Sequence, residues 1–284
     1  MLTIIYMVWA VVLGALQIRT SVRRVELVVA RGGRSWVLAV TLVLLTAWFV
    51  RGQAASCGRW AVVALRSLLA SLAGVAALAL LQARWDNLLP PQIEGGDLFC
   101  AVGATLGVLS VQIYGEFLRG EGDAATLRYP AEVCVLLAFL LMAVQGVLGV
   151  ELAGRVEDPL LTLSRNVGVE GAFQRAESLL AAVLLLADLA LLTLLFWSVR
   201  RGAERLWRVR RGWGVTLSMA AAVLIGGSWP IQETYVRGFR LWVVPWVGLV
   251  LGIGIPAVLA VSACVKSKKA RAYLVAEEGK DGTS

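Results

Sequence analysis

The chain has 284 residues, of which 59% are hydrophobic and 16% are charged, and its mean hydropathy is +0.77. Soluble domains carry about a quarter charged residues, so this composition excludes an ordinary water-soluble fold. The apolar residues also form long blocks, and a block of roughly 18 or more is the length that spans a bilayer as a helix. Because lipid cannot satisfy free backbone N–H and C=O groups, we predict an all-α, polytopic membrane helix bundle.

The apolar blocks predict about eight transmembrane helices. Their expected ranges are 2–18, 35–50, 60–83, 98–118, 130–150, 178–199, 212–229 and 241–265. The first block has no small-residue cleavage site after a basic segment, so it is not interpreted as a signal peptide. An amphipathic continuation of this helix through Arg19, Arg23, Arg24 and Glu26 is an alternative to its end at residue 18.

One connection between the predicted helices is longer and more polar than the others. Residues 151–177 contain five acidic residues and three arginines. Such a segment is too polar to lie in lipid as a free helix. We expect an external loop, with a short surface helix as an option.

The distribution of Lys and Arg predicts the orientation. The side that holds both termini carries more of them, including six arginines between residues 200 and 211, which favours cytoplasmic termini. Five arginines between the first two helices argue the other way. We expect a transmembrane domain over 1–270 and a disordered, polar cytoplasmic tail over 271–284. The net charge of +8 fits orientation signals and contacts with the lipid bilayer, so no nucleic-acid partner is expected.

The chain contains no histidine, and its four cysteines lie in or beside separate apolar blocks without a CxxC pair. Histidine-based haem ligation, zinc hydrolysis and Ser-His-Asp chemistry are therefore excluded. No pair of acidic residues shares a helix face inside a predicted span. We expect no metal, no cofactor and no enzymatic activity.

Asp188 stands in the middle of the apolar run from Leu184 to Leu192. A charged carboxylate at the centre of a span costs about 2.5–3.5 kcal/mol on the insertion scale, so it needs compensation. Protonation or a partner such as Arg66 would supply it. A proton- or ligand-coupled site and a structural interhelical pair both remain open for Asp188, and Arg66 could instead reach the bilayer surface.

Four short motifs occur in order along the chain. They are Arg59-Trp60 with Asp86-Asn87-Leu88-Leu89-Pro90; Ile113-Tyr114-Gly115-Glu116-Phe117; Asp158-Pro159-Leu160 to Arg165 with Phe173-Gln174-Arg175-Ala176-Glu177-Ser178-Leu179; and Pro256 in the last helix, followed by Lys266, Lys268 and Lys269. Together they resemble the B subunits of spore germinant receptors, the GerAB type, in the amino acid, polyamine and organocation transporter superfamily. The resemblance implies a transporter-like fold with inverted repeats. In this register the family's first two helices are missing, which predicts a truncated form of that fold.

The span 98–118 carries the candidate ligand site. An unwound, glycine-containing helix centre exposes backbone groups that bind a carboxylate or an ammonium group, and the resemblance adds weight to this interpretation. A close-packing notch at Gly103 and Gly107 is the alternative, and Glu116 could simply pair with Arg119 near the helix end. The candidate ligand-binding residues are Gly103, Gly107, Ser110, Gln112, Tyr114 and Glu116.

The resemblance implies the membrane subunit of a germinant receptor that senses a small amino-acid-like ligand in the spore inner membrane or a bacterial cytoplasmic membrane. Its implied partners are the A- and C-type subunits of that receptor. An amino-acid permease is one alternative, although it needs the complete pair of broken helices. A membrane assembly protein that binds no ligand is the other.

Overall fold

The computed structural model describes residues 2–29, 35–51, 54–83, 128–156, 158–166, 176–207 and 212–258, and every regular element in these ranges is a helix. The chain divides into two compact units. The first comprises Met1–Gln92 and Tyr114–Pro230, and the second comprises Ile93–Ile113 and Ile231–Ser284. The helical elements and the long apolar segments among them confirm the prediction of a helical membrane protein.

In its described residues, the first unit has six longer helices and two short ones. The longer helices are α1 (Leu2–Val29), α2 (Ser35–Val50), α3 (Ala54–Gln82), α5 (Arg128–Leu148), α8 (Ala176–Trp207) and α9 (Trp213–Ser228), and the short ones are α6 (Val150–Arg155) and α7 (Pro159–Asn166). Each longer helix corresponds to a predicted apolar block. The helix expected over 98–118 and the tail expected over 271–284 lie outside the described residues.

Three helical segments are long and apolar enough to cross a membrane: Leu2–Val28, Ser178–Trp207 and Glu233–Val258. Four further apolar segments are shorter: Trp36–Val50, Arg66–Gln82, Ala138–Leu148 and Trp213–Ser228. The first helix does not end at residue 18 but continues to Val29, so the amphipathic continuation is the alternative that the structure has. The polar side chains after residue 18 can belong to this helix because other helices of the unit supply partners for several of them, among them Ser21 and Arg24.

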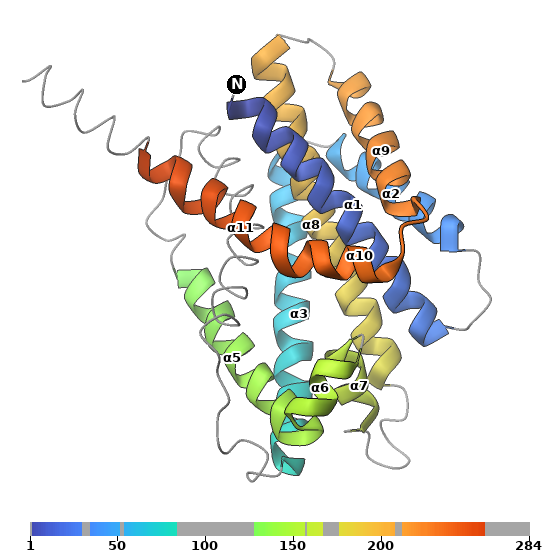
Figure 1. The fold of residues 1–284 in the computed structure, drawn as a ribbon, viewed down its shortest axis with the longest axis vertical. Helices are drawn as coiled ribbons and strands as arrows, with labels where there is room; N and C mark the ends of the chain where they lie inside the picture. Colours follow the sequence, from blue (N-terminus) through green and yellow to red (C-terminus); the bar gives the residue numbers. More distant parts are fainter. Residues whose placement is uncertain are drawn as a thin grey trace, which may run out of the picture. The chain divides into compact units, whose positions relative to one another are not determined.

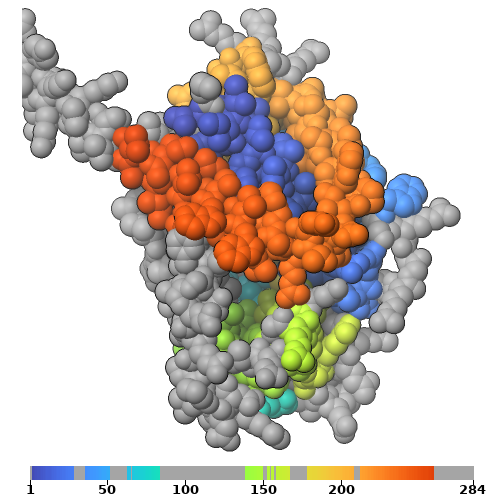
Figure 2. Space-filling view, in the orientation of Figure 1, coloured from blue at the N-terminus to red at the C-terminus, as the bar shows by residue number. Residues whose placement is uncertain are grey.

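Helix α8 is the common neighbour in the first unit, where it packs against α1, α2, α3, α7 and α9 (Figure 1). Phe196, Leu192 and Leu195 on α8 are almost fully buried. α1 runs antiparallel to α8, since Gly202 of α8 lies against Thr3 and Met7 while Asp188 contacts Ser21 and Arg24. Figure 2 shows α1 in blue beside α9 in orange on one face of the molecule, as their contacts require. Residues far apart in sequence thus meet along α1.

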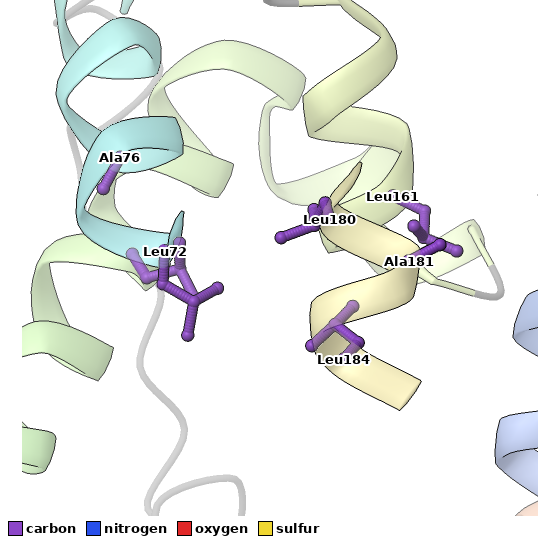
Figure 3. Close-up of a cluster of buried hydrophobic side chains, with 7 residues drawn as sticks. Leu72, Ala76, Leu161, Leu180, Ala181 and Leu184 are labelled. Atoms are coloured by element: carbon purple, nitrogen blue, oxygen red, sulfur yellow. The ribbon is translucent and has the colours of Figure 1, made fainter. Parts of the chain in front are cut away.

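The predicted external loop contains two short helices, α6 and α7. A short surface helix was expected there, but α7 buries part of its apolar side chains. Leu161 and Leu163 of α7 are 2% and 0% exposed. Leu161 joins a cluster with Leu72 and Ala76 of α3 and with Leu180, Ala181 and Leu184 of α8 (Figure 3). The segment is polar as a whole, but burial of its few leucines stabilises the packing of α7 against α3 and α8. This burial explains why α7 is packed against the bundle rather than exposed on its surface.

The second unit contains one continuous helical segment in its described part. It comprises α10 (Glu233–Gly238), η3 (Phe239–Val243), α11 (Val244–Leu249) and η4 (Val250–Gly254) and continues to Val258. In η3 and η4 the turns are π-helical: Val244 N–H donates to Phe239 O, and Ile255 N–H donates to Val250 O. Each wide turn lies just before a proline, Pro245 or Pro256. Proline lacks an N–H and its ring collides with the carbonyl four residues earlier, and a wider turn relieves that conflict.

Several tryptophans lie at helix ends and are exposed. They include Trp36 and Trp48 on α2, Trp207 at the end of α8, Trp213 at the start of α9 and Trp229 after it. The indole ring favours the headgroup level of a bilayer, so these positions suit anchoring at the two membrane surfaces.

Candidate functional site

Asp188 is buried inside the first unit, with 6% of its surface exposed, and its carboxylate accepts hydrogen bonds from three residues of α1. Gln17 Nε2 lies 2.6 Å from Oδ1, and Ser21 Oγ lies 2.7 Å from Oδ2. Arg24 Nη1 lies 3.2 Å from Oδ1 and 3.0 Å from Oδ2. Four donor contacts therefore stabilise a charged carboxylate in an otherwise apolar stretch of α8, which is the compensation that its position demands.

The three donors form a stripe along α1. Residues 17, 21 and 24 are spaced by four and three, so they share one face of an α-helix. Ser21 is completely buried, and its hydroxyl also lies 2.9 Å from the carbonyl oxygen of Gln17. A hydroxyl has one proton, and the charged carboxylate is the stronger acceptor, so Ser21 donates to Asp188.

Arg24 is shared between two carboxylates. Its Nε lies 2.8 Å from Asp158 Oδ2, while Nη1 faces Asp188. Asp158 immediately precedes α7, and its Oδ1 lies 3.3 Å from the backbone nitrogen of Leu161, a helix-capping contact. We define the Asp188 network as Gln17, Ser21, Arg24, Asp158 and Asp188. The network joins Gln17, Ser21 and Arg24 in the second half of α1, Asp158 just before α7, and Asp188 near the middle of α8.

The hydrogen-bonding positions of the Asp188 carboxylate are occupied by donors within the network. The four donor contacts match the roughly four lone-pair positions of a carboxylate. A solute could bind Asp188 only by displacing one of its donors. Removing one partner of a buried ion pair is costly, since the other is left as an uncompensated charge. Chemically, the network can hold α1, α7 and α8 in fixed positions. It can also respond to a proton or a charged solute, because either changes the net charge of Asp158, Asp188 and Arg24.

The residues of α1 are the part of this network that the sequence interpretation missed. We expected a partner such as Arg66, but the structure gives Arg24 as the counter-ion of Asp188, and Arg66 is exposed on α3. The spacing of Gln17, Ser21 and Arg24 on one face of an apolar helix is the signal that could have identified them. The candidate ligand-binding residues lie outside the described residues: Gly103, Gly107, Ser110, Gln112, Tyr114 and Glu116.

A second polar group lies near the C-terminal end of α8. Arg200 Nε is 2.9 Å from Glu204 Oε1, and Arg200 Nη1 donates to the carbonyl oxygen of Val50 at 2.8 Å. Val50 is the last residue of α2, where helix carbonyls lack partners within their own helix. Arg200 therefore caps α2, and a structural role accounts for this group.

The described part of the chain contains no group of three or more Cys, Asp or Glu side chains that could hold a metal ion. The charged cluster with the deepest burial there is the Asp188 network, and it is the candidate functional site.

A comparison with protein families identifies a relative of the middle part of the chain. The family model of the spore germination proteins matches residues 127–236. A search of curated proteins and a search of solved structures each found no match. The matched region contains α5 to α9 and with them Asp158 and Asp188, whereas Arg24 lies before it. The matched family is a transporter- or receptor-like membrane family rather than an enzyme class. Over residues 127–236 the chain is therefore similar to the spore germination protein family, which confirms the resemblance and indicates a germination-related, permease-like membrane protein.

Proposed function

We propose that the protein is the membrane subunit of a spore germinant receptor and that it responds to a small amino-acid-like ligand. The observation that carries this proposal is the family match over residues 127–236, which spans the part of the chain that supplies both acids of the Asp188 network. A buried carboxylate with a shared counter-ion is costly to maintain in lipid, and such residues mark functional positions in membrane proteins.

The structure supports a role for Asp188 that depends on charge. Its contacts connect α1 with α8, and through Arg24 with α7, so a change in the charge of this carboxylate alters the contacts of three helices. A two-state element that a ligand can bias is what a receptor needs in order to transmit binding. Assembly with A- and C-type subunits in the spore inner membrane belongs to the same proposal.

The first experiment replaces Asp188 by Asn in spores that carry no other copy of the protein. Asparagine keeps the size of the side chain and part of its hydrogen bonding but removes the charge. We expect the variant to reach wild-type levels in the membrane and to lose the nutrient response, measured as loss of optical density after an amino-acid mixture is added. Wild-type responses of both Asp188→Asn and Asp188→Leu would contradict a functional role for the charge.

The same spores distinguish the two alternatives. A permease predicts uptake of radiolabelled amino acids that depends on the protein, and an assembly protein predicts that the A and C subunits are lost from the membrane when it is deleted, whatever the nutrient. The receptor proposal predicts a response that is lost in Asp188→Asn while both partner subunits remain at wild-type levels.

A further inference from the structure

Arg51 directly follows the last residue of α2, and its side chain lies between two tryptophan rings. The guanidinium carbon is 5.3 Å from the ring centroid of Trp48 and 4.6 Å from that of Trp213. The backbone nitrogen of Arg51 donates to the carbonyl oxygen of Trp48 at 3.1 Å, which turns the chain back toward α2. Trp213 is the first residue of α9, so Arg51 connects the end of α2 with the start of α9.

The two aromatic contacts leave the hydrogen-bonding capacity of Arg51 unused. A cation–π contact employs the charge of the guanidinium group and none of its N–H donors, of which arginine has five. Among the described residues, none accepts a hydrogen bond from this side chain or forms an ion pair with it, and the residue is exposed. Its donors are therefore available to an acceptor from outside the chain.

The surroundings of Arg51 carry an excess of positive charge. Arg200 and Arg201 share one carboxylate, that of Glu204, at 2.9 and 3.5 Å. Arg205 follows on α8, and three further arginines lie between α8 and α9 in the sequence. Basic clusters of this kind attract anions at a membrane surface.

The elements around Arg51 are held together by the ion pair of Arg200 with Glu204. Arg200 also donates to the carbonyl oxygen of Val50, the last residue of α2. A Cβ atom added at Gly212 would lie 2.8 Å from both Arg200 Nε and Glu204 Oε1, so the residue before α9 packs directly on this pair. The two tryptophans that flank Arg51 therefore belong to helix ends that are already fixed, and a ligand has little to order when it binds.

The level of Arg51 in the bilayer identifies the source of the anion. The apolar segment Trp36–Val50 ends at this point, and the apolar segment Trp213–Ser228 begins there. Trp48 and Trp213 are 66% and 40% exposed, and indole rings favour the headgroup region. Arg51 therefore lies where two helices leave the hydrocarbon, at the depth of the lipid phosphates.

We propose that Arg51, flanked by Trp48 and Trp213, binds the phosphate of an anionic phospholipid headgroup. The planar guanidinium group can donate two parallel hydrogen bonds to two phosphate oxygens, which lysine cannot do. The excess of arginine at this end of α8 favours a lipid with a net negative charge over a zwitterionic one. The site concerns the bilayer and not the germinant, so it stands or fails independently of the receptor proposal.

The test is native mass spectrometry of the purified full-length protein, released from detergent micelles that contain dioleoyl phosphatidylglycerol. Wild type and Arg51→Gln are mixed in one sample, where their masses distinguish them and both meet the same lipid concentration. We expect the affinity of the variant for phosphatidylglycerol to be about tenfold lower, because a charge-assisted, bidentate contact is lost.

Two further variants separate the parts of the site. Arg51→Lys keeps the charge but not the planar fork, so the affinity should fall about threefold. Trp213→Leu removes one of the two rings that position the guanidinium group, and the affinity should fall about two- to fivefold. Lipid-free Arg51→Gln should melt at the wild-type temperature, and Arg51→Lys decides the question if it does not.

Arg205→Gln is the matched control, because it removes the same charge from an exposed position at the same end of α8. It should bind phosphatidylglycerol like the wild type. Equal losses in Arg205→Gln and Arg51→Gln would refute a defined site, since diffuse attraction would then explain the binding, and wild-type affinity of both Arg51 variants would refute it as well. Equal retention of phosphatidylcholine, or release of the lipid by inorganic phosphate, would overturn the assignment to an anionic headgroup.

Discussion

The carboxylate of Asp188 is stabilised by donors that lie 164 to 171 positions away in the sequence. Its own helix shows only that a partner is needed, because a lone acid stands among leucines. Which helix supplies that partner depends on packing between α1 and α8, and local sequence pattern does not contain this information. The residue could therefore be predicted, but its counter-ion could not.

Ser21 offers a direct test of how much this hydrogen bonding contributes. Ser21→Ala removes a completely buried hydroxyl that donates to a charged acceptor, and we expect it to lower the free energy of unfolding by about 1–2 kcal/mol. The control is Ser218→Ala on α9, whose hydroxyl is exposed and bonds to the carbonyl oxygen of Val215 in its own helix. Thermal unfolding of the two variants in one detergent gives the comparison. Equal melting temperatures for both would show that the Ser21–Asp188 contact contributes nothing measurable.

Helices α1 and α9 approach each other closely through small residues. A Cβ atom added at Gly227 would lie 3.2 Å from the backbone oxygen of Ala15, and one added at Gly226 would lie 3.0 Å from the Cβ atom of Ala15. Small residues at such contacts let helix backbones pack tightly in lipid, where van der Waals contact is a main source of association. The absence of a side chain at these glycines is therefore a packing requirement.

Gly227→Ala is expected to destabilise the protein by about 1–3 kcal/mol, because the backbone oxygen that it meets cannot move away as a flexible side chain could. Gly214→Ala on the same helix is the matched control, since an added Cβ there meets no atom within 4 Å. Alanine has the higher helix propensity, so this control should be neutral or slightly stabilising. Thermal unfolding of both variants gives the comparison, and similar changes in the melting temperature of the two would show that the close contact at Gly227 does not set the stability of α9.

The elements themselves were more predictable than their contacts. Long apolar blocks identified α2, α5 and α9 to within a few residues, since a helix in lipid must satisfy its backbone locally. By contrast, α8 ends eight residues later than expected, and α3 begins six residues earlier. The end of α1 was harder to predict, because Arg24 and its neighbours look like a surface segment until the acids that cover them are known. Helix α7 was missed as a core element because its few leucines are surrounded by charges.

At the scale of the first unit, two groups of polar contacts lie at different levels of α8. The Asp188 network lies near the middle of α8, whereas Arg200 and Glu204 lie near its C-terminal end. The guanidinium of Arg51, after α2, lies 4.6 Å from the ring centroid of Trp213 at the start of α9. The Lys and Arg count of the sequence predicts that the C-terminal end of α8 faces the cytoplasm.

Cysteine labelling tests this orientation in intact bacterial cells. Asn166 at the end of α7 and Arg205 near the C-terminal end of α8 are exposed, and each is replaced by Cys in a chain whose native Cys57, Cys100, Cys134 and Cys264 are alanine. A membrane-impermeant thiol reagent should label Asn166→Cys in intact cells and Arg205→Cys only after permeabilisation. The opposite pattern would place both termini outside the cytoplasm.

The two sets of contacts along α1 together determine how this helix can move. Gln17, Ser21 and Arg24 face α8, while Gly14 and Ala15 face α9, so partner-specific residues occupy neighbouring sectors of the helix circumference. Turning α1 about its own axis by one residue, about 100°, would carry the donors to Asp188 toward the glycines of α9 in one direction, or small residues toward Asp188 in the other. Either rotation separates the Asp188 carboxylate from its donors, whereas a tilt or a slide of α1 together with α8 and α9 preserves both sets of contacts.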